Sequence, residues 1–228
     1  MTERGFTAAE YGILRGSQLF SGFSQEDFSY ALDFFGARAA RYEKGEFLHR
    51  VGSRLSRFGL VLSGRVQVHM DDFEGNLLIM ANVTPGKTFG ESLCFLEREE
   101  EPVTISAAED TRVAWLGTEA VRRFSKDVRD HELRLRFITL VTGRALAMND
   151  RIQILSKRGL RDKLMVFFSQ CAHQYGGGTF TLPLSRADMA SYLGTDRSAL
   201  SRELSRMQAE GILEYHRNRF RLLRPDET

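Results

Sequence analysis

The chain has 228 residues, 42% hydrophobic and 27% charged, which is typical of a globular protein with one large domain or two modest ones. Its 32 Lys and Arg nearly balance its 30 Asp and Glu, for a net charge of +2. Two cysteines, Cys94 and Cys171, exclude a disulfide-stapled scaffold and a four-cysteine metal site. No run approaches the roughly 18–20 apolar residues of a membrane helix, and no secretory signal is visible, so we expect a cytoplasmic protein.

Short segments of β-forming residues dominate residues 36–117, where glycines punctuate the chain. Val66, Val68 and Met70 alternate with polar neighbours, which is the period of a half-buried strand. Strands are predicted at 58–64, 65–70, 76–83, 103–108 and 111–117. This spacing favours an antiparallel β-sandwich or barrel, called the β-roll below. Short helices before the roll are expected to pack phenylalanines against it, namely Phe20, Phe23, Phe28, Phe34 and Phe35.

A long helix is predicted between Gly117 and residue 156, because this stretch contains no proline and its apolar residues recur at steps of three and four. The recurring positions are Ile138, Val141, Ala145, Met148, Ile152 and Leu155. Such a stripe serves either as a dimer seam or as packing within one domain, and we expect the dimer seam. Residues 156–159 break the pattern and are predicted to form a hinge.

The C-terminal third is basic, since residues 156–228 carry twelve Lys and Arg against eight Asp and Glu. This excess favours a module that binds a polyanion, although a solvated face would show it too. A helix is expected over 160–172, followed by a glycine tip at 176–178 and a short strand at 180–182.

The stretch from 185 to 207 has the pattern of a helix-turn-helix. Ser185 is a good N-cap, Gly194 suits a left-handed turn, and Thr195 or Asp196 is placed to cap a second helix. On the second helix the apolar residues fall on one face and small hydroxyls with one arginine on the other. The outward set is Ser198, Ser201, Arg202 and Ser205. Such a slim face without an acid suits the major groove, unless Arg202 simply pairs with Asp196 or Glu203.

A hairpin is predicted after the second helix, with strands near 211–213 and 220–223 and a turn at 215–219. His216, Arg217 and Arg219 gather at this turn, where a wing would approach the phosphate backbone. The patterns together predict an α+β chain with a jelly-roll-like double-stranded β-helix, a dimerisation helix and a winged helix-turn-helix. The expected domains are 1–117, 118–156 and 157–228.

Over residues 15–224 the chain resembles the Crp/Fnr family of bacterial transcription regulators. The most specific elements are Phe89-Gly90-Glu91 and the six residues Arg197-Ser198-Ala199-Leu200-Ser201-Arg202. The resemblance implies a homodimer that binds palindromic double-stranded DNA and works with RNA polymerase. It implies that Arg202 reads a guanine, whereas Ser198 replaces the family's usual glutamate. The implied DNA contacts are Arg202, Ser201, Ser198, Arg197, Ser205, Arg186, Ser185, His216 and Arg217, of which Ser185, Arg186 and His216 would contact phosphate.

The resemblance also bears on the signal. The branch that binds cyclic AMP carries an Arg-Ser or Arg-Thr pair eleven residues after the glycine, where this chain has Glu101-Pro102. An acid there would repel a cyclic phosphate, so we predict no cyclic-nucleotide binding and an unidentified effector. The candidate pocket comprises Phe89, Gly90, Glu91, Cys94 and Glu101. Gly90-Glu91 is alternatively a purely structural turn, and Cys94 is either a redox-sensitive thiol or an inert buried one.

No cofactor or metal is predicted. An Fnr-type cluster needs cysteines near the N-terminus, and none precedes Cys94; His49, His69 and His131 show no haem-ligand pattern. A cupin-like metal enzyme needs several converging histidines, and the chain has no His-x-His pair. An effector-independent DNA-binding dimer is the other alternative. We expect a regulator rather than an enzyme.

Overall fold

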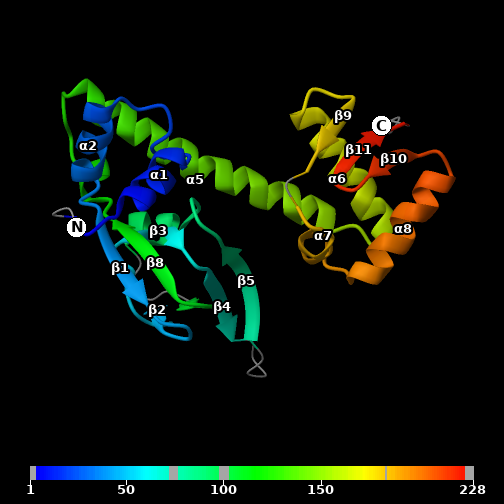
Figure 1. Cartoon of the computed structure of the whole chain (residues 1–228), viewed down its shortest axis with the longest axis horizontal. Coiled ribbons are helices and arrows are strands. Elements are labelled where there is room, and N and C mark those ends of the chain that lie inside the picture. Colours follow the sequence, from blue (N-terminus) through cyan, green and yellow to red (C-terminus); the bar gives the residue numbers. More distant parts are fainter. Residues whose placement is uncertain (1–3, 72–76, 98–102, 183, 224–228) are drawn as a thin grey trace. The chain divides into compact units, whose positions relative to one another are not determined.

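The computed structural model describes residues 4–71, 77–97, 103–182 and 184–223 (Figure 1). The chain divides into two compact units, Met1–Thr142 and Gly143–Thr228, which are described separately below. Helix α5 (Val128–Leu155) begins in the first unit and ends in the second. Within the four described ranges, no helix combines the length and apolar character that crossing a bilayer requires.

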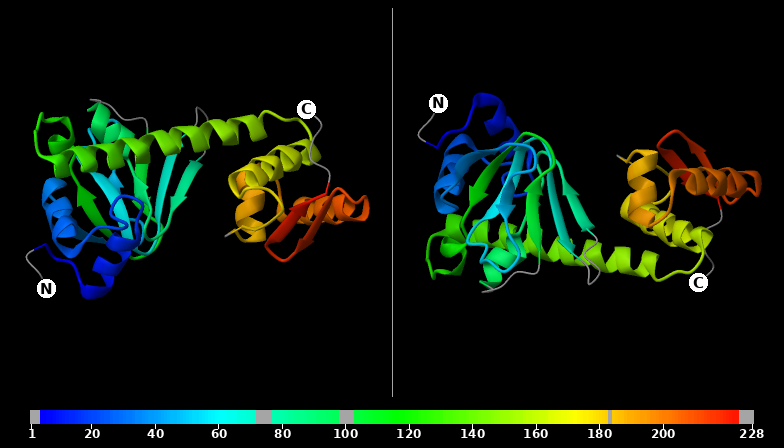
Figure 2. Two further views of the ribbon diagram at one scale, coloured as in Figure 1. Left: turned by 90° about the horizontal axis from the view of Figure 1, so that it is seen from above. Right: turned by 90° about the horizontal axis from the view of Figure 1, so that it is seen from below.

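The first unit contains an antiparallel β-roll made of two sheets (Figures 1 and 2). One sheet has the order β1-β8-β3-β6 and the other β2-β7-β4-β5. The strands are β1 (Arg38–Tyr42), β2 (Phe47–His49), β3 (Phe58–Ser63), β4 (Val66–Asp71), β5 (Leu77–Val83), β6 (Thr88–Phe89), β7 (Thr104–Ala107) and β8 (Thr111–Leu116). The predicted roll and its five predicted strands are therefore confirmed.

Three strands were not predicted, because β1 is rich in Arg and Ala and β2 and β6 are too short to show a period. β1 is held instead by its partner, with Arg38 opposite Trp115 and Tyr42 opposite Thr111 on β8.

The turn between β3 and β4 requires glycine. Gly64 has φ +77°, and a Cβ there would lie 2.4 Å from the Asp110 carbonyl oxygen.

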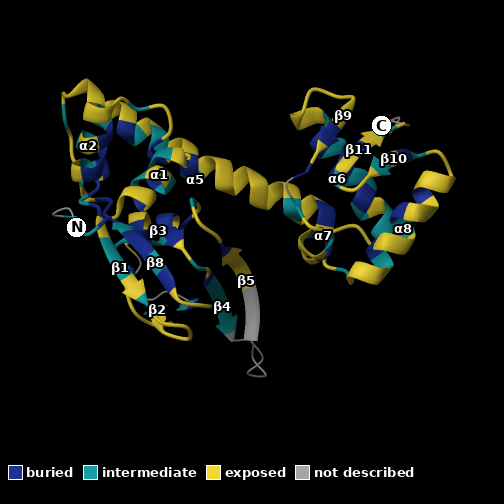
Figure 3. Cartoon of the chain, viewed as in Figure 1, coloured by how far each residue is buried: buried dark blue, intermediate teal, exposed yellow. Residues whose placement is uncertain are grey.

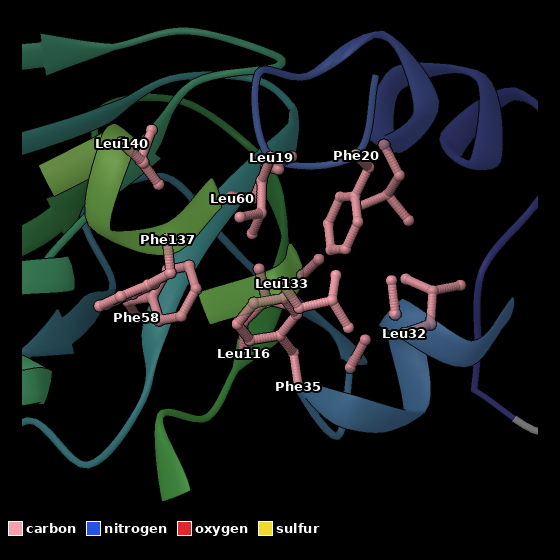
Figure 4. Packing of buried hydrophobic residues seen from close by; sticks show 14 of the residues in the cluster. Leu19, Phe20, Leu32, Phe35, Phe58, Leu60, Leu116, Leu133, Phe137 and Leu140 are labelled. Carbon is pink, nitrogen blue, oxygen red and sulfur yellow. The ribbon is translucent and has the colours of Figure 1, made fainter. Parts of the chain in front are cut away.

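An aromatic core joins the N-terminal helices α1 (Ala8–Gly16) and α2 (Gln25–Phe34) to the roll. Phe20, Phe28 and Phe35 are buried in it, as expected, and Phe23 and Phe34 pack against it partly buried. The start of α5 also belongs to this core, through Leu133, Phe137 and Leu140 (Figure 4).

The long helix begins later than predicted. A short helix, α4 (Glu119–Arg122), comes first, and α5 starts at Val128 rather than near residue 118. Polar side chains cap the helix at this point. The Ser125 hydroxyl accepts a hydrogen bond from the Asp127 amide, and the Asp127 carboxylate accepts one from the Arg129 amide. Asp127 thus satisfies a backbone donor that the first turn leaves free.

The second unit is a winged helix-turn-helix, as predicted. Its elements are α6 (Leu160–Gln174), β9 (Thr179–Thr181), α7 (Arg186–Leu193), α8 (Arg197–Ala209), β10 (Leu213–His216) and β11 (Arg219–Leu222), with sheet order β10-β11-β9. Ile154 at the end of α5 is fully buried in this unit's core. Residues 156–159 separate α5 from α6, whereas their action as a hinge stays a prediction.

Arg186, at the start of α7, ties the helices to the wing. Its Nη2 donates a hydrogen bond of 2.7 Å to the Arg217 carbonyl at the hairpin turn. Its guanidinium lies over the rings of Tyr215 and Phe220, at 5.2 and 5.0 Å from their centroids. Arg217 has a left-handed φ of +52°, which is unfavourable for a non-glycine residue, so the Arg186 contact stabilises a strained turn.

Replacing Arg186 with Ala removes this hydrogen bond and both cation–π contacts. We expect the free energy of unfolding of the second unit to fall by about 1–3 kcal/mol and the wing amides to exchange faster. Arg221→Ala is the matched control, because Arg221 is an exposed wing arginine 3.8 Å from Glu214, and a loss below about 1 kcal/mol is expected. Denaturant unfolding measures the free energy, and hydrogen exchange measures the opening of the wing. Equal effects of the two variants would contradict the stabilising role of Arg186.

Candidate nucleic-acid interface

Local hydrogen bonds cap the starts of α7 and α8. Ser185 caps α7 by accepting from the Asp188 amide at 3.1 Å, and the Asp188 carboxylate accepts from the Ser185 amide and hydroxyl, which lowers the pKa of Asp188. Gly194 ends α7 in the left-handed region at φ +63°. Asp196 then caps α8 by accepting from the Ala199 amide at 2.7 Å. Ser185 and Gly194 act as predicted, and Asp196 rather than Thr195 is the second cap.

α8 separates a buried face from an exposed one (Figure 3). Leu200, Leu204 and Met207 are completely buried in the core of the second unit. Five predicted contact residues are exposed on the other side, namely Arg197, Ser198, Ser201, Arg202 and Ser205. The Ser201 and Ser205 hydroxyls donate to carbonyls one turn earlier, so these side chains stay close to the helix. The exposed face is therefore slim between Arg197 and Arg202.

Arg202 is not paired with an acid in the described part of the chain. Its Nη1 lies 3.3 Å from the Ser198 hydroxyl, and that hydroxyl in turn donates to Asp196 at 2.6 Å. Hydrogen bonds from Ser198 and the Ala199 amide hold the pKa of Asp196 below its ordinary value. The positive charge of Arg202 also contributes to lowering the pKa of Asp196, but the two form no salt bridge, and the Arg202 guanidinium is exposed.

Glu203, an acid on the helix that carries the candidate DNA contacts, is turned away from the exposed face. Arg161 on α6 binds it at 2.7 Å, and Arg206 binds it at 3.1 Å. Arg161 also makes a two-point contact with Glu210, at 2.7 and 2.8 Å. These hydrogen bonds raise the pKa of Arg161 and lower that of Glu210. Arg161 and Glu210 were not predicted from the sequence, where the only signal for them was an acid, Glu203, at a position that is half-buried.

The other predicted DNA contacts lie at α7 and the wing. His216, Arg217 and Arg219 are exposed around the hairpin turn, where we predicted basic residues. Ser185 already accepts the capping hydrogen bond, and Arg186 is half-buried against the wing, where burial lowers its pKa. Contact of these residues with phosphate stays a prediction.

The predicted effector pocket centres on a buried turn in the first unit. Gly90 has φ +77° and precedes α3 (Glu91–Leu96); a Cβ on it would lie 2.4 Å from Leu55 Cδ2. Phe89, Glu91 and Cys94 are buried, and the Glu91 carboxylate accepts a hydrogen bond from Thr88. Glu101 lies outside the described residues. The Thr88 contact supports a structural role for Glu91, and the pocket remains a prediction.

Cys94 is held inside the first unit. Its Sγ lies 3.2 Å from the Ser56 carbonyl oxygen and 3.4 Å from the Thr118 hydroxyl. Burial raises the pKa of the thiol, which lowers the fraction of reactive thiolate. These contacts favour the inert form of Cys94 over the redox-sensitive one.

The apolar stripe on α5 is largely exposed in the protomer. Ile138, Met148 and Ile152 are 50%, 63% and 61% exposed, and Leu155 is 40% exposed. Ala145 is exposed too, whereas Val141 packs partly buried against the core of the first unit. Apolar side chains left in water along a helix are typical of an interface.

Two of the three histidines considered as ligands, His49 and His69, each contact a hydroxyl group. His49 Nδ1 lies 3.3 Å from the Ser53 hydroxyl, and His69 Nε2 lies 3.1 Å from the Ser106 hydroxyl. In the ranges that the structure describes, no three His, Cys, Asp or Glu side chains gather as a set of metal ligands.

Two protein-family models match the chain. The model described as a cyclic nucleotide-binding domain matches residues 39–127, and the model described as a Crp-like helix-turn-helix domain matches residues 162–227. These matches coincide with the β-roll and the winged helix-turn-helix.

Relatives align over most of the chain. The transcriptional activator protein FnrA of Stutzerimonas stutzeri is 27% identical over 85% of this chain and 80% of its own. The cyclic AMP receptor protein of Thermus thermophilus is 26% identical over 88% of this chain and 89% of its own.

Solved structures share the fold. The catabolite activator protein of Thermus thermophilus has a TM-score of 0.50 at 24% identity, covering 90% of this chain and 93% of that one. OCPA-complexed CprK has a TM-score of 0.59 at 15% identity, covering 89% and 91%. With a cyclic nucleotide-binding-type domain followed by a Crp-like helix-turn-helix domain, the chain belongs to the Crp/Fnr family of DNA-binding transcription regulators.

Proposed function

We propose that the chain acts in the cytoplasm as a homodimer that binds a palindromic DNA site, where it regulates transcription by RNA polymerase rather than catalysing a reaction. One observation carries the proposal, namely the exposed face of α8, which presents Arg197 and Arg202 with small serines while Glu203 is bound by Arg161. A slim face of hydrogen-bond donors enters the major groove, and arginine forks match the O6 and N7 acceptors of guanine.

Dimerisation is supported by the stripe on α5. Ile138, Met148, Ile152 and Leu155 repeat at the spacing of a two-helix seam and are exposed in the protomer. Burying them against a second copy of the helix removes apolar surface from water, which favours association. A symmetric dimer presents α8 twice, to successive major grooves roughly 34 Å apart on a palindromic site.

We further propose that the signal acts at the β-roll, near residues 86–94, and is not a cyclic nucleotide. Where the cyclic-AMP-binding branch of the family has an arginine, this chain has Glu101, whose carboxylate would repel a cyclic phosphate. Helix α5 contributes Phe137 to the core of the first unit and Ile154 to that of the second. Differential affinity of the signal for two states of the protein would couple the roll to DNA binding.

The DNA-reading role is tested by selecting sites from random DNA with the wild type and Arg202→Ala. Loss of a bidentate guanine contact costs about 1–3 kcal/mol per half-site, so we expect weaker binding and one relaxed G·C position in each half-site. Arg206→Ala is the control, because Arg206 lies one turn further along α8 and pairs with Glu203. It is expected to enrich the wild-type palindrome. Selection of the same fixed guanine by Arg202→Ala would refute the assignment.

The dimer is tested by replacing both Met148 and Ile152 with Glu. Because both side chains are exposed, the protomer should stay folded, whereas charges in the seam should separate the copies. We expect monomers by sedimentation and a loss of specific DNA affinity of at least about tenfold, because half of the palindrome is then unread. Ala147→Glu, exposed and about 100° around the helix from Met148, should remain dimeric. A dimeric double variant would mean that the stripe is not the interface.

A further inference from the structure

The first unit contains a pocket of about 570 Å³, and two of its lining residues, Leu55 and Trp115, pack beside the Phe89–Glu91 turn. It opens beside β1, β2 and β8 and the segment that leads into β3. Its lining residues are Tyr42, Phe47, Leu48, His49, Arg50, Ser53, Arg54, Leu55, Ser56, Arg57 and Trp115. The volume lies within the roughly 300–1,000 Å³ that small-molecule sites occupy.

Among the residues that the structure describes, three arginines and no acid line this pocket. Arg54 pairs with Glu97 at 2.9 Å, and Arg57 donates to the Gly36 carbonyl at 2.8 Å. Arg50 lies over the Phe47 ring, 3.8 Å from its centroid, and has no carboxylate partner in the described part of the molecule. A guanidinium that lines a pocket without a counter-ion is suited to bind an anion.

Aromatic side chains form the other part of the wall. Trp115 Nε1 donates a hydrogen bond of 2.9 Å to the Tyr42 hydroxyl, which fixes both side chains. The Trp115 ring also packs edge-on against Phe89, at 5.5 Å between centroids. With Phe47 on β2, these rings offer flat apolar surface beside the arginines.

A buried polar atom also lacks a partner here. His49 is only 7% exposed, and its Nδ1 faces Ser53, but its Nε2 has no hydrogen-bond partner among the described residues. Burial lowers the pKa of His49, so the imidazole is held neutral and can donate or accept. Because His49 lines the pocket, its imidazole adds a polar group to the wall beside the arginines.

We infer that this pocket binds a small aromatic anion, whose carboxylate or phosphate group contacts Arg50 and whose ring lies against Phe47 and Trp115. This site is distinct from the predicted effector pocket around Phe89–Glu91. Binding of the anion can be measured without DNA, so its test does not depend on the proposed DNA-binding function. It also contacts α3, because Leu55 packs at Gly90 and Arg54 pairs with Glu97.

The chain offers a direct probe, because Trp115 is its single tryptophan. Phenylacetate and phenyl phosphate, titrated separately into the full-length protein, should change Trp115 fluorescence saturably and give heat by calorimetry. The tighter of the two identifies the preferred head group. Acetate, which lacks the ring, and benzyl alcohol, which lacks the charge, should bind at least about tenfold more weakly. Benzyl alcohol binding as tightly as both anions, or no saturable signal from either anion, would overturn the inference.

Arg50→Gln separates the pocket from non-specific binding. This substitution should lower the affinity for the more tightly bound anion by about tenfold or more. The affinity for benzyl alcohol should stay unchanged, because only the charge-assisted contact is lost. Arg41→Gln is the control, since Arg41 lies next to Tyr42 on β1, is exposed and does not line the pocket. Equal affinity of Arg50→Gln and the wild type, with both folded by circular dichroism, would refute the site.

Discussion

The contact of Arg161 with Glu203 and Glu210 determines what the helix-turn-helix presents to DNA. One guanidinium on α6 satisfies two carboxylates of α8 and the turn after it, at 2.7–2.8 Å. Without that contact, Glu203 would keep only Arg206 as a partner, and more of its negative charge would act beside the exposed arginines and repel phosphate. With it, Glu203 is paired, and serine hydroxyls, Arg197 and Arg202 are exposed on α8 after its cap at Asp196, as the proposed interface requires.

The remaining features position that face. The two capping residues Ser185 and Asp196 and the left-handed Gly194 fix the turn, while Leu200, Leu204 and Met207 anchor α8 in the core. Arg186 holds the wing against the same unit. Helix α5 leaves an apolar stripe exposed. In our proposal two copies of the chain associate through this stripe, and the dimer presents α8 to the DNA twice. Base reading, dimerisation and sensing are thus assigned to separate surfaces of the chain.

Most of this architecture was predictable where local patterns carry the information. Strand alternation in β4, the cap at Ser185 and the glycine at residue 194 each follow from short-range chemistry. The strand β1 was missed because pairing with β8 overrides its weak propensity, and α5 starts late because Asp127 caps a backbone donor. Arg161 contacts acids that are distant in sequence, and the pocket around Arg50 combines residues 42–57 with Trp115, which periodicity does not connect. The orientation of Glu203 could not be predicted from its position on the helix, because its partners Arg161 and Arg206 determine it.

The most direct measurement is a double-mutant cycle on DNA affinity with Arg161→Gln, Glu203→Gln and the combined variant. We expect Arg161→Gln to weaken binding by about tenfold or more, because it frees the Glu203 charge near the phosphates. Adding Glu203→Gln should then restore most of the affinity, which identifies the released carboxylate as the cause. If the combined variant binds DNA as weakly as Arg161→Gln alone, Arg161 does not act by controlling Glu203, and another interaction must clear the exposed face of α8.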